Sequence, residues 1–528
     1  MPAVTRNAPA LAATALCWAI VAVLVAVILG QTHGTFVYPL DDTYIHLALA
    51  RTLAAHGVWG IGPQEFGSAS SSPGWTLLLA ALTKLFGPHA LTPLVVNLLL
   101  AAVLLFVADA ALQRFQPSIT LRARFLALVA IVLLTPLPNL ILVGMEGVAQ
   151  TLSILLLVLC GIETLTTEAS TRVTLALLAS AFFVGAIRYE AVFAIVPLCV
   201  LLALRRRLPL AVLTGLAAAI MPAAFGWYAH RLSGFWLPFS IIMKQRGAYA
   251  SMHDRLLDLL HSKLIFTEAL LLLAVLMFLR RRRGLWEPAQ LLLLLTFCVT
   301  LLHSLKEPTG TLLRYDSYLI TLILVTLAVL VMQVPPTLAE LKQPAGMVLA
   351  VLAAFFALHL TWRSAKHGAL VTEEAAVDRY HDHLQMARFV ASFYSHDTVA
   401  LNDIGTVAFY TDATLLDLAG LGSVEPVRAV AQGRRLTREE VASWAASRNA
   451  SIAILQPQWI YVARITPASW TLVATWRVPR DVVFGDPLVG FYAISPQQVP
   501  RLCRALADFP LLPEDTLRWQ SGVCENRH

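Results

Sequence analysis

Long apolar runs recur along the first two thirds of this chain, and they limit the folds that it can adopt. Runs of roughly 18 to 23 residues match the hydrocarbon thickness of a bilayer, and they continue until about Trp362. Of the 528 residues, 58% are hydrophobic and only 13% are charged. This composition excludes a soluble enzyme and predicts a polytopic α-helical membrane protein.

The apolar runs predict about eleven membrane-spanning helices. We expect them near residues 10–30, 91–112, 123–140, 147–164, 172–187, 190–204, 208–229, 263–279, 288–304, 313–332 and 345–362. The apolar stretch Pro73–Phe86 is shorter and is followed by Gly87 and Pro88. We therefore expect an interfacial or re-entrant helix there and not a span.

Basic clusters orient these helices, because Lys and Arg near span ends are retained in the cytoplasm. With eleven spans, the clusters all fall on one side of the membrane. They are Arg6, Arg114 with Arg122 and Arg124, Arg205–Arg207, and Arg280–Arg283. We therefore expect a cytoplasmic N-terminus, a first span that acts as an uncleaved signal anchor, and a C-terminal segment outside the cytoplasm.

The composition changes to that of a soluble domain after Trp362. We expect a transmembrane domain of residues 1–362, with a first outer loop of residues 31–90, and an exported α/β domain of residues 363–528. In the exported domain, periodicity predicts helices at 376–394 and 436–448 and strands at 397–401, 451–455, 470–476 and 488–494.

The cysteines divide into two groups. Four lie inside apolar spans and are interpreted as small packing residues: Cys17, Cys160, Cys199 and Cys298. Cys503 and Cys524 lie in the exported segment, where an oxidising compartment favours a disulfide between them. Two unrelated thiols are the alternative.

The outer loops of this topology collect acidic and basic side chains, beginning with the pair Asp41 and Asp42. The other polar or aromatic candidates are Tyr44, His46, Ser72, Trp75, Glu146, Arg188, Glu190, Lys244, Arg246, Arg314 and Tyr315. Charged residues are missing from the middle of almost every span, which argues against an ion-coupled transporter.

Each candidate also has a structural alternative. An aspartate of the pair would serve as the N-cap of the helix that follows, and Glu146 would form an ion pair with Arg188. The basic residues would anchor helix ends in the lipid head groups. These alternatives do not account for five outer loops that bring both acids and bases to one face.

Transfer of a sugar from a lipid-linked donor needs such an arrangement. A polyprenyl-phosphate sugar keeps its tail in the bilayer and its phosphate at the surface, so cationic groups at that depth would hold the departing phosphate. A carboxylate on the other side of the anomeric carbon would take the proton of the attacking hydroxyl. Asp41 and Asp42 are the candidates for this base.

Short motifs in these loops resemble those of the GT-C membrane glycosyltransferases. The motifs are Asp41-Asp42-Thr43-Tyr44-Ile45, Ser71-Ser72-Pro73-Gly74-Trp75, Gly144-Met145-Glu146, Arg188-Tyr189-Glu190, Leu237-Pro238-Phe239-Ser240 and Arg314-Tyr315. The nearest likeness is to the mycobacterial arabinofuranosyltransferases that use decaprenyl-phosphate arabinose. The segments Leu401–Thr406 and Leu416–Leu421 also resemble the periplasmic domain of that group.

This resemblance implies an inverting transfer of arabinofuranose, or of a related pentose, to an acceptor glycan at the outer face of a bacterial cytoplasmic membrane. It implies Asp41 or Asp42 as the base. It also implies a donor and phosphate pocket lined by Glu146, Arg188, Glu190, Lys244, Arg246, Arg314 and Tyr315, and a substrate loop that carries Tyr44, His46, Ser72 and Trp75.

Two departures from the family pattern concern the identity of the sugar. Tyr189 stands where relatives usually show proline, and Phe239 stands where many show asparagine. Transfer of mannose or another hexose to a protein or lipid therefore remains the alternative within enzymes. The partners would be the donor lipid, the bilayer and a polysaccharide, lipid or protein acceptor, with no nucleic acid.

A divalent cation is a possible cofactor. Asp42 and His46 stand four residues apart, so they would share one face of a helix and are candidates for a metal site. His381 and His383 offer further imidazoles, but a spacing of two points them to different sides of a helix.

A binding protein of another class, such as a lipid-glycan flippase or a scaffold of a cell-wall complex, is the remaining alternative. The cytoplasmic loops carry no glycine-rich phosphate-binding motif, so no ATP-driven step is expected.

Overall fold

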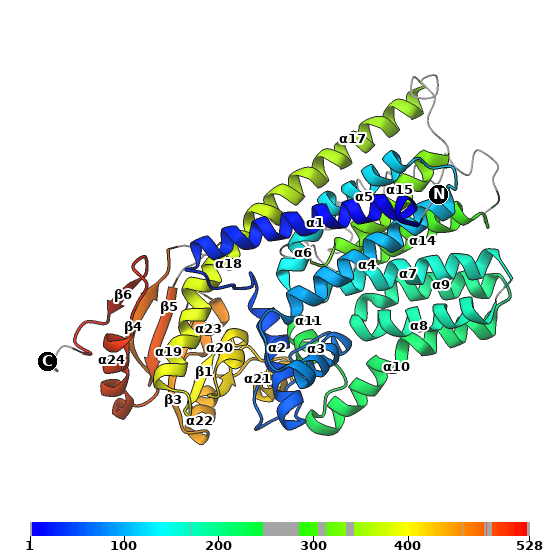
Figure 1. Ribbon diagram of the computed structural model, residues 1–528. Coiled ribbons are helices and arrows are strands. Elements are labelled where there is room, and N and C mark those ends of the chain that lie inside the picture. The colour runs from blue at the N-terminus through cyan, green and yellow to red at the C-terminus, as the bar shows by residue number, and fades with distance from the viewer. Residues whose placement is uncertain are drawn as a thin grey trace.

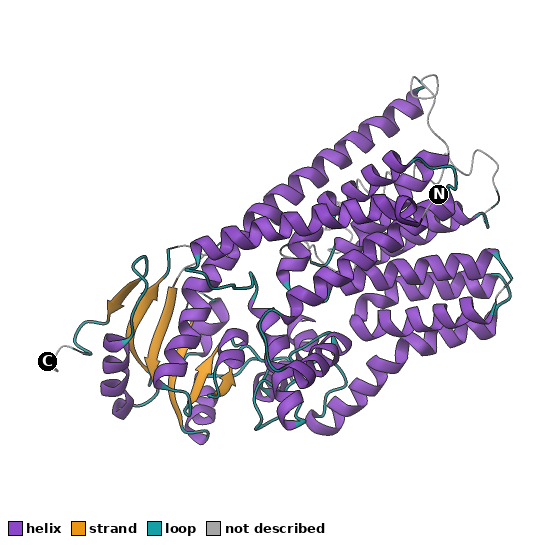
Figure 2. Cartoon of the chain, viewed as in Figure 1, coloured by secondary structure: helices purple, strands orange, loops and turns teal. Residues whose placement is uncertain are grey.

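The computed structural model describes residues 3–168, 170–245, 284, 286–304, 312, 314–333, 343–457, 459–479, 482 and 488–524. Helices fill one end of the molecule and a β-sheet lies at the other end (Figure 2). The N-terminus lies at the helical end and the C-terminus beside the sheet (Figure 1). The long helices α1 (Ala3–Gln31) and α17 (Pro344–Ser364) both run from the helical bundle toward the sheet.

The rest of the helical region follows the apolar runs. Its helices are α2 (Asp41–His56), α3 (Pro73–Phe86), α4 (Thr92–Phe115), α5 (Leu121–Leu134), α6 (Leu137–Val143), α7 (Gly147–Thr166), α8 (Thr171–Ile187), α9 (Val192–Leu204), α10 (Leu208–Ser233), α11 (Phe239–Gln245), α14 (Pro288–Ser304) and α15 (Ser317–Gln333).

Within the described residues, 5 helices are long and apolar enough to cross a membrane, or up to 6 if the bent pair α5 and α6 forms one span. Helices α8, α14 and α15 are apolar but shorter, at 17 residues each. The polytopic helical fold is therefore confirmed in its coarse form. The expected span at 263–279 and the cluster Arg280–Arg283 lie outside the described residues, so the count of eleven stays a prediction.

Residues 31–90, the expected first outer loop, contain two helices, and the second of them is the short helix expected at Pro73–Phe86. α2 ends at His56, and Gly57 follows with φ 70°, a left-handed conformation that glycine adopts without a steric penalty. α3 begins with Pro73, whose fixed φ suits the first helical turn, and its 14 residues are too few to span a bilayer. α2 packs against α3 and also against α20 (Gly405–Tyr410), which belongs to the C-terminal region.

The C-terminal region contains a six-stranded sheet with the order β2-β1-β3-β5-β4-β6. Its strands are β1 (Thr398–Leu401), β2 (Thr414–Asp417), β3 (Ala450–Leu455), β4 (Thr471–Arg477), β5 (Leu488–Ala493) and β6 (Thr516–Trp519). β1 pairs in parallel with β2 and β3, and the other pairs are antiparallel. Thr398 and Thr414 are the first pair of residues in the parallel ladder between β1 and β2.

Both faces of this sheet are covered: successive side chains of a strand point to opposite faces, and β3 is buried at Ser451–Leu455 without a break. Val399 and Ile452 belong to one buried cluster, which also holds Phe389 of α19 (Gln385–Phe393) and Leu502 of α24 (Val499–Asp508). The next residues along the strands face the other way. Ala400 and Ala453 lie in a second cluster with Val441 of α22 (Arg438–Ser447) and Val462 of α23 (Ile460–Ile465).

The remaining helices of this region are α18 (Leu370–Arg379) and α21 (Val424–Ala431), and π-helical turns occur at Ala365–Ala369 and Tyr380–Leu384. The predicted helices and the four predicted strands of the tail occur within a few residues of their expected positions. β2 and β6 were not predicted, because strands of only 4 residues each carry too little periodicity. A disulfide joins Cys503 of α24 to Cys524.

Candidate functional site

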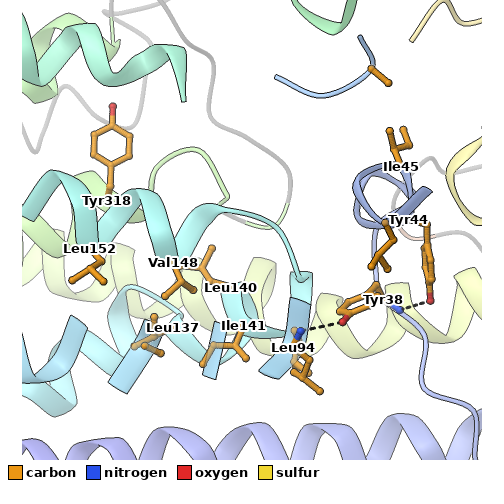
Figure 3. Close-up of a cluster of buried hydrophobic side chains, with 14 of the residues drawn as sticks. Tyr38, Tyr44, Ile45, Leu94, Leu137, Leu140, Ile141, Val148, Leu152 and Tyr318 are labelled. Atoms are coloured by element: carbon orange, nitrogen blue, oxygen red, sulfur yellow. Dashed lines mark hydrogen bonds between the residues drawn. The ribbon is translucent and has the colours of Figure 1, made fainter. Parts of the chain in front are cut away.

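The chain that enters α2 is held by a buried tyrosine pair (Figure 3). The hydroxyl of Tyr38 donates a hydrogen bond to the carbonyl of Ala90 at 2.8 Å and accepts one from the amide of Leu94 at 3.1 Å. The hydroxyl of Tyr44 accepts a hydrogen bond from the amide of Tyr38 at 3.2 Å. These bonds fix the first turn of α2, and Tyr44 therefore packs in the core instead of lining an open pocket.

Asp41 and Asp42 open α2, and they point in different directions because successive residues of a helix are rotated by about 100°. Neither acts as the N-cap of α2. The cap position is Leu40, which has no side-chain cap hydrogen bond. The structural alternative of a helix cap is thus wrong for this helix.

Asp42 faces the other charged residues of the loops. A carboxylate oxygen of Asp42 accepts a hydrogen bond from Nη1 of Arg314, and the Asp42 side chain is 37% exposed. Arg314 belongs to the turn that precedes α15, so this pair joins the first outer loop to a segment 272 residues away. The guanidinium of Arg314 also lies 4.9 Å from the centroid of the Tyr315 ring.

Arg188 ends α8 and contacts the same tyrosine. Its Nη1 donates to Glu146 Oε1 at 2.6 Å, and its Nε and Nη2 donate to the two carboxylate oxygens of Glu190 at 3.0 and 2.5 Å. Its guanidinium lies 4.9 Å from the centroid of the Tyr315 ring. Two arginines therefore share one aromatic ring, and the ion pair of Glu146 with Arg188 is present.

His46 lies one turn after Asp42 and completes this group. Its Nε2 is 3.5 Å from Glu146 Oε2, and its Nδ1 is 3.2 Å from the hydroxyl of Thr76. Burial lowers the pKa of His46 below its usual value, which favours the neutral imidazole. We call Asp42, His46, Glu146, Arg188, Glu190, Arg314 and Tyr315 the polar cluster.

The polar cluster holds three carboxylates and two guanidiniums, and it leaves some hydrogen-bonding capacity unused. Among the described residues, the buried Nε of Arg314 and the buried Oε2 of Glu146 have no hydrogen-bond partner. A buried polar atom without a partner is costly, so these two atoms can bind a hydrogen-bonding ligand or water at a gain in free energy.

The other predicted site residues have different surroundings. Trp75 is buried in a cluster with Leu79 and Ile187. The hydroxyl of Ser72 donates to the carbonyl of Ile187 at 2.5 Å, which ties the loop to the end of α8. Lys244 lies on α11, and Arg246 lies outside the described residues.

Asp41 contacts the C-terminal region instead of the polar cluster. Its Oδ1 accepts hydrogen bonds from the amide and the hydroxyl of Thr406 at 2.7 and 2.6 Å, and its Oδ2 accepts one from the amide of Gly405. Asp41 thus caps the N-terminus of α20, 364 residues further along the chain. Its exposed fraction is only 6%.

His383 and Asp403 join Asp41 in a second group. Nε2 of His383 lies 2.6 Å from Asp403 Oδ2, and one ligand atom from each of the three residues lies within 4.8 Å of the others. Nδ1 of His383 lies 2.5 Å from Asp382 Oδ1. Burial and the carboxylate of Asp403 raise the pKa of Asp41 to about 8. Burial lowers the pKa of His383, but Asp382 outweighs it and raises that pKa to about 10.

The sequence alone placed Asp403 only in the motif Leu401–Thr406, and it did not predict that His383 would lie beside Asp403 and Asp41. The two signals in the sequence were the segment Leu401–Thr406, which resembles a periplasmic domain, and the imidazole of His383. The metal candidates Asp42 and His46 are placed in the polar cluster, next to Arg314 and Glu146 respectively. His381 contacts Asp515 at 3.0 Å, so His381 and His383 do point to different sides.

Comparisons with known proteins give a fold and little else. The family described as "Domain of unknown function (DUF8728)" matches residues 372–492. No curated protein matches the chain. The structure of ArnT from Cupriavidus metallidurans in the apo state is similar, with a TM-score of 0.56, 14% identity, and coverage of 92% of this chain and 99% of that chain.

ArnT from the same organism bound to undecaprenyl phosphate has a TM-score of 0.55 and 13% identity, and the coverage is again 92% of this chain and 99% of the other. Arabinofuranosyltransferase AftD from Mycobacteria has a lower TM-score of 0.45 at 14% identity, over 91% of this chain and 41% of that one. The two ArnT structures, with TM-scores of 0.56 and 0.55, show that this chain shares their fold.

Proposed function

We propose that this chain, which has the fold of the GT-C membrane glycosyltransferases, transfers a sugar from a polyprenyl-phosphate donor to an acceptor glycan at the outer face of a membrane. The observation that carries the proposal is the polar cluster, in which the carboxylate of Asp42 lies beside the guanidinium of Arg314. ArnT, which has a similar fold, binds undecaprenyl phosphate in its crystal structure, and this supports a lipid-phosphate donor for the present chain.

Arg314 is the cation best suited to the departing phosphate. Its Nε has no hydrogen-bond partner among the described residues, whereas three N–H groups of Arg188 already donate to Glu146 and Glu190. Arg188 would therefore act mainly by positioning Tyr315 and Glu146. Because three carboxylates face two guanidiniums, a phosphate needs further positive charge, and we assign that role to Lys244 and Arg246.

Of the two candidate bases, we propose Asp42. Asp41 is almost fully buried, and both of its oxygens accept hydrogen bonds from α20, so an acceptor hydroxyl has no approach to it. Asp42 is 37% exposed and lies within the polar cluster.

The proposed reaction is an inverting displacement. The acceptor oxygen forms a bond to the anomeric carbon, and its proton moves to the carboxylate of Asp42. The bond between the anomeric carbon and the phosphate oxygen breaks, and the phosphate leaves with the electron pair. Arg314 stabilises the negative charge that develops on this phosphate. The motif resemblance favours arabinofuranose or a related pentose, and a hexose is the alternative.

The test is glycosyl transfer by the purified full chain in lipid nanodiscs, with a panel of polyprenyl-phosphate pentoses and hexoses and a glycan acceptor. Asp42→Asn and Asp41→Asn are compared with Asp508→Asn, a matched change at an exposed position near the end of α24. Loss of a general base lowers transfer by about 100-fold or more.

We expect Asp42→Asn to lose transfer to that extent and Asp508→Asn to keep it. Transfer retained by Asp42→Asn would refute the assignment of the base. Binding of a donor without transfer from any member of the panel would favour the flippase or scaffold alternative over the enzyme.

A further inference from the structure

We propose that Asp41, His383 and Asp403 bind one divalent transition-metal ion of the Zn²⁺ type, between the first outer loop and the C-terminal sheet region. The proposal concerns a site outside the polar cluster. It stands or fails independently of the sugar-transfer reaction.

Three separate elements supply the ligand atoms. Asp41 is the first residue of α2, His383 lies in the π-helical turn Tyr380–Leu384, and Asp403 lies between β1 and α20. One ligand atom from each lies within 4.8 Å of the others. Ligands that bond one Zn²⁺ at about 2.1 Å lie roughly 3 to 4 Å apart, so small side-chain rotations bring these atoms to bonding distance.

The ring of His383 contacts a carboxylate through one nitrogen, as the rings of metal-binding histidines commonly do. Nδ1 of His383 lies 2.5 Å from Asp382 Oδ1, and this contact directs Nε2 toward Asp403. A histidine ligand in a metal site donates its other ring N–H to a carboxylate or carbonyl in this way, which fixes its tautomer and its orientation. Asp382 would therefore be a positioning residue.

The charges around this site also favour a divalent cation. Asp382 and Arg379 neutralise each other, with their charged atoms 3.2 Å apart. When the three side chains bind a metal they lose their protons, so Asp41 and Asp403 then supply two negative charges beside a neutral imidazole, and the exposed fraction of the Asp403 side chain is only 13%. Buried charges must be paired or bind a metal, and one divalent ion balances these two.

The donor set selects the kind of ion. One imidazole and two carboxylates suit Zn²⁺, and three protein ligands leave a fourth position for water. Ca²⁺ and Mg²⁺ prefer oxygen ligands alone. A bound ion would fasten the start of α2 to the sheet region and so restrain Asp42, the next residue in the chain.

The test uses the full chain in detergent, stripped with a chelator, dialysed and then titrated with Zn²⁺ alone. Metal content is measured by mass spectrometry, and thermal unfolding is followed in parallel. The variants are His383→Ala, Asp403→Asn and Asp382→Asn. The matched control is His381→Ala, which removes an imidazole of the same turn that contacts Asp515.

We expect one Zn²⁺ per chain, a higher Tm with Zn²⁺ than without it, and no change in the His381→Ala control. His383→Ala and Asp403→Asn should lose the ion, and Asp382→Asn should bind it about 10- to 100-fold more weakly. Asp403→Asn keeps the size of the side chain, so the test remains decisive if His383→Ala fails to fold.

Three results would overturn the proposal. They are less than stoichiometric Zn²⁺ in the reloaded chain, equal Zn²⁺ content in His383→Ala and His381→Ala, and a Tm that responds to Mg²⁺ or Ca²⁺ but not to Zn²⁺. If the reloaded chain binds less than one Zn²⁺, hydrogen bonds from a protonated His383 to the carboxylates would hold this cluster together instead of a metal ion.

Discussion

Gly405→Ala tests the contact between α2 and α20 directly. A Cβ atom at this position would lie 2.3 Å from the carbonyl oxygen of Asp41, 2.7 Å from its Oδ2 and 2.8 Å from the amide nitrogen of Ile45. Two of these three atoms belong to the backbone of α2, so no side-chain rotation relieves the clash. The start of α20 must therefore move away from α2.

The size of the effect follows from the bonds that this movement breaks. Ordinary contact distances require a shift of about 1 Å, which stretches the hydrogen bonds from Gly405 and Thr406 to Asp41 beyond useful length. Each of the three hydrogen bonds contributes about 0.5 to 1.5 kcal/mol, and overpacking costs about 1 to 3 kcal/mol. Since such terms do not add fully, we expect a loss of about 3 to 5 kcal/mol.

The assay is thermal unfolding of the full chain, with Gly30→Ala as the matched control, because a Cβ at Gly30 meets nothing within 4 Å. For a region of this size, about 1 kcal/mol shifts Tm by roughly 2 to 4 °C, so Gly405→Ala should lower the Tm of the C-terminal region by at least about 6 °C. Hydrogen exchange at the amides of α20 should also accelerate. If Gly405→Ala and Gly30→Ala unfold at the same temperature, the close approach of the two helices is wrong.

Two further predictions concern other contacts. Arg188→Lys cannot keep the three hydrogen bonds to Glu146 and Glu190, and breaking a buried ion pair costs about 3 kcal/mol or more. Thermal unfolding should therefore show a lower Tm than in the exposed control Arg428→Lys, and equal values would mean that the ion pair contributes little. Cys503→Ser opens a disulfide between residues 21 apart, which should cost about 3 kcal/mol. Reducing agent should lower the Tm of the original chain and leave that of Cys503→Ser unchanged, and an unchanged Tm in both would exclude a stabilising disulfide.

Several features of the fold depend on local pattern, and the sequence predicts them well. Apolar runs predict the long helices because a bilayer core requires about 20 apolar residues for each span. Glycine often ends a helix, so Gly57 predicts the end of α2, and short strand-like runs in the tail predict β3 and β5. The short strands β2 and β6 escape prediction, since four residues carry too little periodicity.

The membership of the polar cluster was also predictable in part. Asp42, Glu146, Arg188 and Arg314 stand out as charged residues at the ends of apolar runs, and the structure brings them together. Tyr44 and Trp75 show the limit of this reasoning. Their place in a polar loop indicates exposure, whereas both are buried: Tyr44 packs against the rings of Phe409 and Tyr410 in α20, and Trp75 packs with Ile187 at the end of α8.

The division of roles between Asp41 and Asp42 is decided by the tertiary structure alone. By itself, the sequence determines that two adjacent acids open a helix after the first apolar run. Rotation by about 100° per residue then directs them to different surroundings, and what lies there comes from distant parts of the chain. Arg314 is 272 residues from Asp42, and Gly405 is 364 residues from Asp41. No periodicity in the sequence encodes such separations, because they arise only when the packed helices and the C-terminal sheet region come together.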